Sequence, residues 1–146
     1  MSRRLAPHAH VSILALATIA GCVFGFRGEV EFAGDASLAG IDTVQLHLPA
    51  TELTLVGDPL RSTIDWRGTW STLGGSANDA LAGGNRADLR WERWEQIGRL
   101  SADLSPDLRD ITSLDELTVE SASDRAHEIV GTGDVFITGI DDYIAV

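Results

Sequence analysis

Polar and apolar residues alternate with a period of two through much of the chain after Ile41. Val44, Leu46 and Leu48 alternate with polar neighbours before Pro49 ends the run. This periodicity is typical of a strand that buries one face and exposes the other. The same alternation recurs in residues 53–55, 63–70, 87–91 and 100–104, and short apolar-rich segments follow at 114–119 and 135–137. The pattern therefore predicts an all-β domain.

Residues 87–104 allow two interpretations. Leu89 and Trp91 alternate with charged residues, and residues 100–104 alternate again, which predicts a hairpin that turns within residues 93–98. Ala87, Trp91, Trp94 and Ile97 also fit the spacing of one helix face. The hairpin is favoured because strands flank this segment on both sides. Before it, residues 73–86 are rich in Gly, Ser, Asn and Asp and predict a loop.

The last third of the chain carries glycine-aspartate units. Gly131-Thr132-Gly133-Asp134-Val135 and Ile137-Thr138-Gly139 follow the segment Leu114-Asp115-Glu116-Leu117-Thr118-Val119. This arrangement resembles the putative-adhesin domain of bacterial cell-envelope proteins, in which such units recur and stack. The resemblance implies a short β-solenoid or a folded, sandwich-like β-sheet over residues 41–146. Because about one and a half units are present, the chain looks like a short or truncated member.

The start of the chain reads as an export signal. Arg3 and Arg4 precede an apolar run at residues 11–20, which is the order of charged and apolar regions in a secretory signal peptide. A membrane-spanning helix needs about 20 apolar residues, so the run is short for a permanent span. We expect a signal helix over residues 1–21.

The one cysteine of the chain closes this signal. Ile19-Ala20-Gly21-Cys22 resembles the lipobox of bacterial lipoproteins, which implies cleavage before Cys22 and lipidation of its thiol. Residues 22–40 would then be a tether between the lipid and the domain. By resemblance to sorting in enteric bacteria, Val23 after the cysteine indicates delivery to the outer membrane.

Charge excludes one class of partner. The chain carries 22 acidic residues against 11 basic ones, all of them arginine, for a formal net charge of −11. Such a surface repels phosphates, so nucleic acid is not an expected partner.

With a single cysteine, no disulfide can form within the chain, and packing must supply the stability.

No catalytic motif or cofactor signature is visible, and we predict a non-enzymatic protein without a cofactor. His8 and His10 would leave with the signal, while His47 and His127 are expected at the surface because no pair has metal-ligand spacing. Gly75-Ser76-Ala77 lacks the second glycine of a nucleophile elbow.

Three aspartates are weak calcium candidates. Asp134, Asp141 and Asp142 supply the oxygen ligands that calcium prefers. Their surroundings do not reproduce the nonapeptide of calcium-binding β-rolls. Solvated turn aspartates are therefore the favoured interpretation, because Asp is a common turn former.

The four tryptophans divide into two groups. Trp66, Trp70 and Trp91 share faces with aliphatic residues and are expected in the core. Trp94 lies between charged residues and is the one expected to be exposed, which makes it a weak binding candidate.

These observations predict a lipid-anchored envelope protein that offers a β-sheet surface for interaction or adhesion to an unidentified envelope partner. The alternative is an exported binding module for calcium or carbohydrate. The apolar run Tyr143-Ile144-Ala145-Val146 further predicts self-association through the edge of a C-terminal strand.

Overall fold

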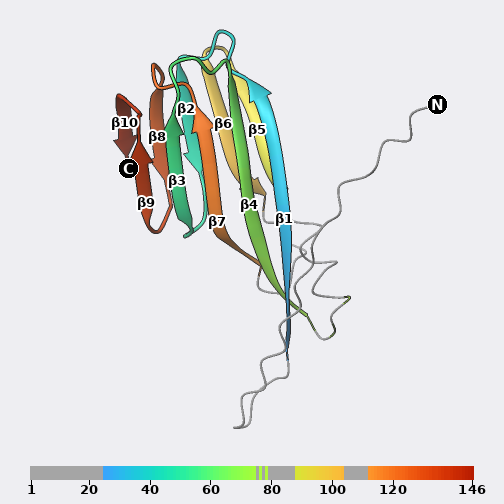
Figure 1. The fold of residues 1–146 in the computed structure, drawn as a ribbon. Coiled ribbons are helices and arrows are strands. Elements are labelled where there is room, and N and C mark those ends of the chain that lie inside the picture. Colours follow the sequence, from blue (N-terminus) through green and yellow to red (C-terminus); the bar gives the residue numbers. More distant parts are fainter. Residues whose placement is uncertain (1–24, 75, 77, 79–87, 104–111) are drawn as a thin grey trace, which may run out of the picture.

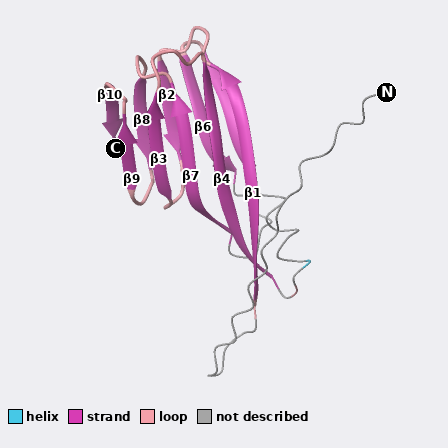
Figure 2. Cartoon of the chain, viewed as in Figure 1, coloured by secondary structure: helices cyan, strands magenta, loops and turns pink. Residues whose placement is uncertain are grey.

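The computed structural model describes residues 25–74, 76, 78, 88–103 and 112–146, and most of them lie in strands (Figure 2). The strands pair as two five-stranded sheets that pack face to face. Their bounds are β1 Phe26–Ser37, β2 Thr43–His47, β3 Glu52–Gly57, β4 Thr63–Gly74, β5 Asp88–Trp94, β6 Ile97–Asp103, β7 Thr112–Ser121, β8 Ala126–Val130, β9 Val135–Thr138 and β10 Asp142–Ala145.

Both sheets are mixed. Sheet A has the strand order β1-β4-β7-β3-β9, and sheet B has the order β10-β8-β2-β6-β5 (Figure 1). In sheet A the pairs β1–β4 and β4–β7 are antiparallel, while β7–β3 and β3–β9 are parallel. In sheet B only β5–β6 is antiparallel. The all-β, sandwich-like prediction is confirmed.

The parallel part of the sandwich resembles stacked coils, but the coils are not in chain order. The chain crosses between the sheets from β2 to β3, from β6 to β7 and from β8 to β9. The β2–β3 crossing lies between the other two, because β2 pairs with both β6 and β8 while β3 pairs with both β7 and β9. The fold is therefore not a simple solenoid in which consecutive coils stack in chain order.

The expected tether over residues 22–40 needs correction. Residues 26–37 form β1, which pairs with the whole length of β4. The reason lies in a weak alternation: Phe32 and Ala36 pack against the core, Val30 is opposite the buried Trp70, and exposed residues of β1 such as Glu31 face outward. The folded unit therefore includes β1 in addition to residues 41–146.

The hairpin prediction is confirmed and the helical alternative is wrong. β5 and β6 pair antiparallel with Trp91 opposite Leu100 and Trp94 opposite Ile97. Glu95, in the left-handed region at φ 51°, helps to close the turn. The loop expected over residues 73–86 begins later than predicted, because β4 continues to Gly74; most of that range lies outside the described residues.

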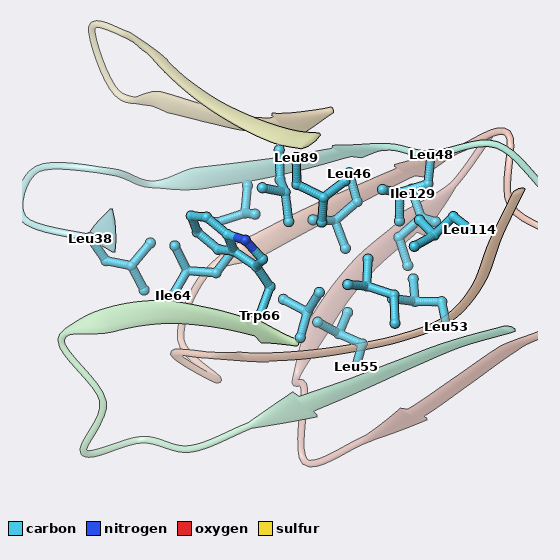
Figure 3. Close-up of a cluster of buried hydrophobic side chains, with 14 of the residues drawn as sticks. Leu38, Leu46, Leu48, Leu53, Leu55, Ile64, Trp66, Leu89, Leu114 and Ile129 are labelled. Atoms are coloured by element: carbon cyan, nitrogen blue, oxygen red, sulfur yellow. The ribbon is translucent and has the colours of Figure 1, made fainter. Parts of the chain in front are cut away.

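One apolar core fills the space between the sheets. In Figure 3, Leu46 and Ile129 of sheet B, together with Leu48 just after β2, approach Leu53 and Leu55 of sheet A. Trp70 is fully buried and Trp66 is 9% exposed, as their alternation predicts. Trp91 is partly buried, and its ring stacks on that of Trp66 at a centroid distance of 6.4 Å.

A partly exposed hydrogen-bond cluster around Asp115 lies at a bulge in sheet A. The register of β4 and β7 shifts between Thr69 and Trp70. The Asp115 carboxylate accepts hydrogen bonds from the hydroxyls of Ser71 and Ser113 and from Arg27, whose Nη2 lies 3.1 Å away. The main chain of Asp115 is also held, because Thr51 donates to its carbonyl oxygen at 2.9 Å.

We expect Asp115→Ala to lower the free energy of unfolding by about 1–3 kcal/mol, because three donors lose a charged acceptor. Glu116→Ala is the matched control, since the neighbouring Glu116 is exposed and has no ion pair among the described residues; it should change stability by about 0.5 kcal/mol or less. Urea denaturation of both variants measures the difference. Equal losses of stability in the two variants would contradict the stabilising role of the Asp115 hydrogen bonds.

Candidate functional site

Trp94 is exposed on the outer face of sheet B, as predicted. Its side chain is 44% exposed, and that of its cross-strand neighbour Ile97 is 38% exposed. The guanidinium carbon of Arg99 stands 4.5 Å from the centre of a Trp94 ring. This cation–π contact is worth about 0.5–1 kcal/mol at an exposed site, and it covers one face of the indole.

A chain of polar side chains extends from Trp94 across sheet B. Arg99 donates from Nε and Nη2 to the Gln45 side-chain oxygen at 3.1 and 3.0 Å. Gln45 in turn donates to the Glu128 carboxylate at 2.7 Å. Three neighbouring strands, β6, β2 and β8, are thereby joined on their outer face. The sequence contains no local signal for this row, because its members are far apart in the chain.

The three aspartates proposed as calcium ligands lie around β9 and β10, and all are exposed. The backbones of two of them form hydrogen bonds with distant segments. The Leu53 amide donates to the Asp134 carbonyl oxygen at 2.9 Å, and the Asp141 amide donates to the Ser123 carbonyl oxygen at 3.4 Å. Within the described part of the chain, no group of three or more His, Cys, Asp or Glu side chains is arranged to hold a metal ion.

The proposed lipidation site, Cys22, lies outside the described residues. Among the residues that are described, no helix has the length and apolar character needed to cross a membrane. The export signal and the anchor therefore remain predictions.

The two later histidines occupy different environments, and the surface prediction fails for His127. His47 is half-buried, whereas His127 is 0% exposed. His127 donates from Nδ1 to the Arg125 carbonyl oxygen at 2.8 Å, so Nε2 is left to accept from the Ser121 hydroxyl at 3.1 Å. Burial lowers the pKa of His127 by disfavouring the charged ring. The alternation of His127 with Ile129 was the available signal for this inward position.

We expect this histidine to make the domain less stable in mild acid. At a pH well above 6.5 the ring is neutral in both states, so it adds no pH dependence. As the pH falls below 6.5, the unfolded chain takes up a proton that the folded chain resists, and stability declines by up to about 1.4 kcal/mol per pH unit. Urea denaturation between about pH 7.5 and 5.5, above the range of ordinary carboxylates, measures this slope.

A variant pair assigns that slope to His127. His127→Gln should flatten the slope, whatever it does to the stability at neutral pH, while His47→Gln should keep it. If His127→Gln keeps the full slope, the buried ring is not the titrating group.

A groove of about 380 Å³ crosses the outer face of sheet A between β1, β4 and β7. Its charged lining includes Asp65, Arg67 and Glu120. Arg61 pairs with Asp65 and, at 2.6 Å, with Glu120, whose other oxygen lies 3.9 Å from Arg67. Asp65, Arg67 and Glu120 thus form a network of surface ion pairs with Arg61, while Asp35, which also lines the groove, has no ion pair among the described residues.

The β9–β10 end of the sandwich gathers exposed apolar side chains. Phe136 is 54% exposed, Tyr143 is 52% exposed, Ile144 is 61% exposed and Val146 is 77% exposed. Strands β9 and β10 are the last strands of sheets A and B on this side, and each has a described partner along one edge only. Unpaired backbone and exposed apolar side chains thus coincide, which is typical of an interaction surface. We refer to β9, β10 and Val146 as the open end.

No family model and no curated protein matches this chain. Among solved structures, it is similar to a putative adhesin from Bacteroides fragilis, with a TM-score of 0.42 and 13% identity, over 74% of this chain and 43% of that one. A putative cell adhesion protein from Clostridium sporogenes gives a TM-score of 0.39 and 11% identity, over 68% and 44%. A putative adhesin from Parabacteroides distasonis gives 0.38 and 9%, over 72% and 37%. This chain spans less than half the length of each, and at these TM-scores its function has to be argued from its own residues.

Proposed function

We propose that this protein is a non-enzymatic lipoprotein of the bacterial cell envelope, held in the outer membrane by acyl chains on Cys22, that binds a protein partner through its open end. The sandwich is the scaffold that keeps the edges of β9 and β10 in place. The lipid restricts the domain to the membrane surface, where a weak contact gains from high local concentration.

One observation carries the interaction role. The buried apolar residues of the described core are at most 9% exposed, whereas three large apolar residues of the open end, Phe136, Tyr143 and Ile144, are each more than half exposed. Leu60, which is 93% exposed, stands in the turn between β3 and β4 rather than in a strand edge. Grouped exposed apolar residues beside free strand edges favour binding, whereas a single exposed residue is ordinary.

The first described strand after Cys22 and the open end lie at opposite edges of sheet A. β1, which begins at Phe26 soon after Cys22, is one edge of sheet A, and β9 is the opposite edge. Four strand spacings of about 4.8 Å place these edges roughly 19 Å apart. Attachment through Cys22 therefore leaves the open end accessible.

Photo-crosslinking in intact cells tests the interaction. A photoreactive phenylalanine derivative at position 136 should yield a covalent adduct with a partner, and the same derivative at position 60 should not. Adducts at both positions or at neither would contradict a partner at the open end.

The lipid anchor is tested separately. Cys22→Ser should move the protein out of the membrane fraction or leave the precursor uncleaved, and mass spectrometry of the wild-type protein should find acyl chains on Cys22.

A carbohydrate-binding module is a second candidate, and Trp94 is the observation that favours it. An exposed indole beside Arg99 and Gln45 combines a stacking surface with planar hydrogen-bonding groups. Binding of envelope oligosaccharides that is lost in Trp94→Ala and kept in Phe136→Ala would favour this function over the first. For calcium, the readout is a rise in melting temperature on addition of the ion, since a ligand of the folded state stabilises it.

A further inference from the structure

The open end has the shape of a step. β8 of sheet B lies opposite the last strand of sheet A, and β10 extends sheet B by one more strand. Tyr143 and Ala145 are in register with the inward-facing His127 and Ile129, so they point to the inner side of sheet B. Both are nevertheless exposed. The position beside β9 that would cover them holds no strand among the described residues.

We propose that a second copy of this chain fills the step, with β10 of each copy pairing antiparallel with β9 of the other. This inference rests on the proposed function, because it names the partner of the same open end. The two copies are related by a two-fold axis parallel to the strands, which exchanges the layers: sheet A of one copy continues into sheet B of the other. Two continuous ten-strand sheets result, and the interface is isologous.

Strand direction agrees with this pairing. The short turns at residues 131–134 and 139–141 reverse the chain, so β9 runs opposite to β8 and β10 (Figure 1). Rotation about an axis parallel to the strands keeps the direction of β10. The β10 strand of the second copy therefore meets β9 in the antiparallel orientation.

Side-chain orientation agrees as well. Phe136 is in register with Thr54 on the outer side of sheet A, and Ile144 is in register with Glu128 on the outer side of sheet B. Placing Phe136 opposite Ile144 of the second copy sets Ile137 opposite Tyr143 and Val135 opposite Ala145. Outer residues then meet outer residues and inner residues meet inner residues. Both tyrosines come to the two-fold axis, where they cover each other.

Charge and area predict a weak but specific dimer. The three central pairs of this register contain no charged residue, and Asp142 falls opposite Thr138, which carries a hydroxyl. A half-exposed aromatic side chain can still bury roughly 100 Å². The exposed side chains of the open end are Phe136, Tyr143, Ile144 and Val146. Counted over both copies at a similar area each, they offer on the order of 800 Å² of buried surface before the strand backbones are included. This area is close to the lower limit of specific interfaces, about 1,000 Å².

Cysteine cross-linking of the full chain in its membrane tests the register. The double variant Phe136→Cys/Ile144→Cys places two thiols side by side across each junction, whereas within one copy they lie on opposite outer faces. A short bismaleimide should convert this variant to covalent dimer. Leu60→Cys/Ile144→Cys is the matched control, with equally exposed thiols but no predicted pairing, and it should give at least about tenfold less dimer, as should each single variant.

A further substitution tests the two-fold axis. Tyr143→Lys in the double-cysteine chain brings two ammonium groups together, which should reduce cross-linking at least about tenfold. Because Tyr143 is 52% exposed in the single copy, the melting temperature should change little. Equal cross-linking in the control, no cross-linking in the double variant, or no effect of Tyr143→Lys would each overturn the proposed dimer.

The cross-linking results also separate the two proposals. An adduct of a different protein at position 136, without covalent dimer, would overturn the dimer and leave the proposed function standing. Reaction of the wild-type chain with bismaleimide would reveal a free Cys22 and contradict the lipid anchor alone.

Discussion

Trp70→Ala is expected to lower the free energy of unfolding by about 3–5 kcal/mol, the range for removing a buried aromatic side chain from a core. Trp70 is 0% exposed, and its ring lies 5.7 Å from that of Phe32 on the paired strand β1. The alanine would leave a cavity at the bulge of β4, where the backbone is already held by the Asp115 cluster and cannot close in. Urea denaturation followed by far-UV circular dichroism measures the loss.

Trp94→Ala is the matched control for this substitution. Trp94 is 44% exposed and loses only its contact with Arg99 and part of its packing, so the expected change is about 1 kcal/mol or less. Similar losses in the two variants would show that the division of the tryptophans between core and surface is wrong.

Gly57→Ala is expected to destabilise the domain by about 1–3 kcal/mol, because the added methyl group collides with the backbone of a neighbouring turn. A Cβ at Gly57 would stand 2.1 Å from the Gly139 carbonyl oxygen. Gly139 itself has a φ of 67°, which favours glycine, and it lies in the turn that leads from β9 to β10. Relief of the collision must therefore displace this turn.

The effect of Gly57→Ala should be concentrated in the open end. Hydrogen exchange should accelerate in β10 more than in β7, because β10 follows the displaced turn. Gly25→Ala is the control: its added Cβ would find its nearest neighbour, the Leu73 side chain, at 3.8 Å, so it should change stability by about 0.5 kcal/mol or less. Uniform acceleration across both sheets would contradict a local displacement.

Several features of this protein follow from sequence pattern alone, because they depend on neighbours along the chain. The alternation around Val44, Leu55 and Trp66 determines which faces are buried, since successive side chains of a strand point to opposite sides. The hairpin of β5 and β6 is equally local. β1 and the inward position of His127 were also available from alternation, although glycines in β1 and the polarity of histidine weaken the signal.

Other features were decided only by the tertiary structure. The order of the strands within each sheet depends on pairings between distant segments, such as β2 between β6 and β8. The row from Arg99 through Gln45 to Glu128 exists because those pairings bring three strands together. The run from Tyr143 to Val146 is apolar throughout, so only the register with β8 shows that Tyr143 and Ala145 face the inner side, and whether that side is covered depends on how many strands each sheet contributes. Burial is a property of the assembled layers, and for this reason the step at the open end could be recognised only in three dimensions.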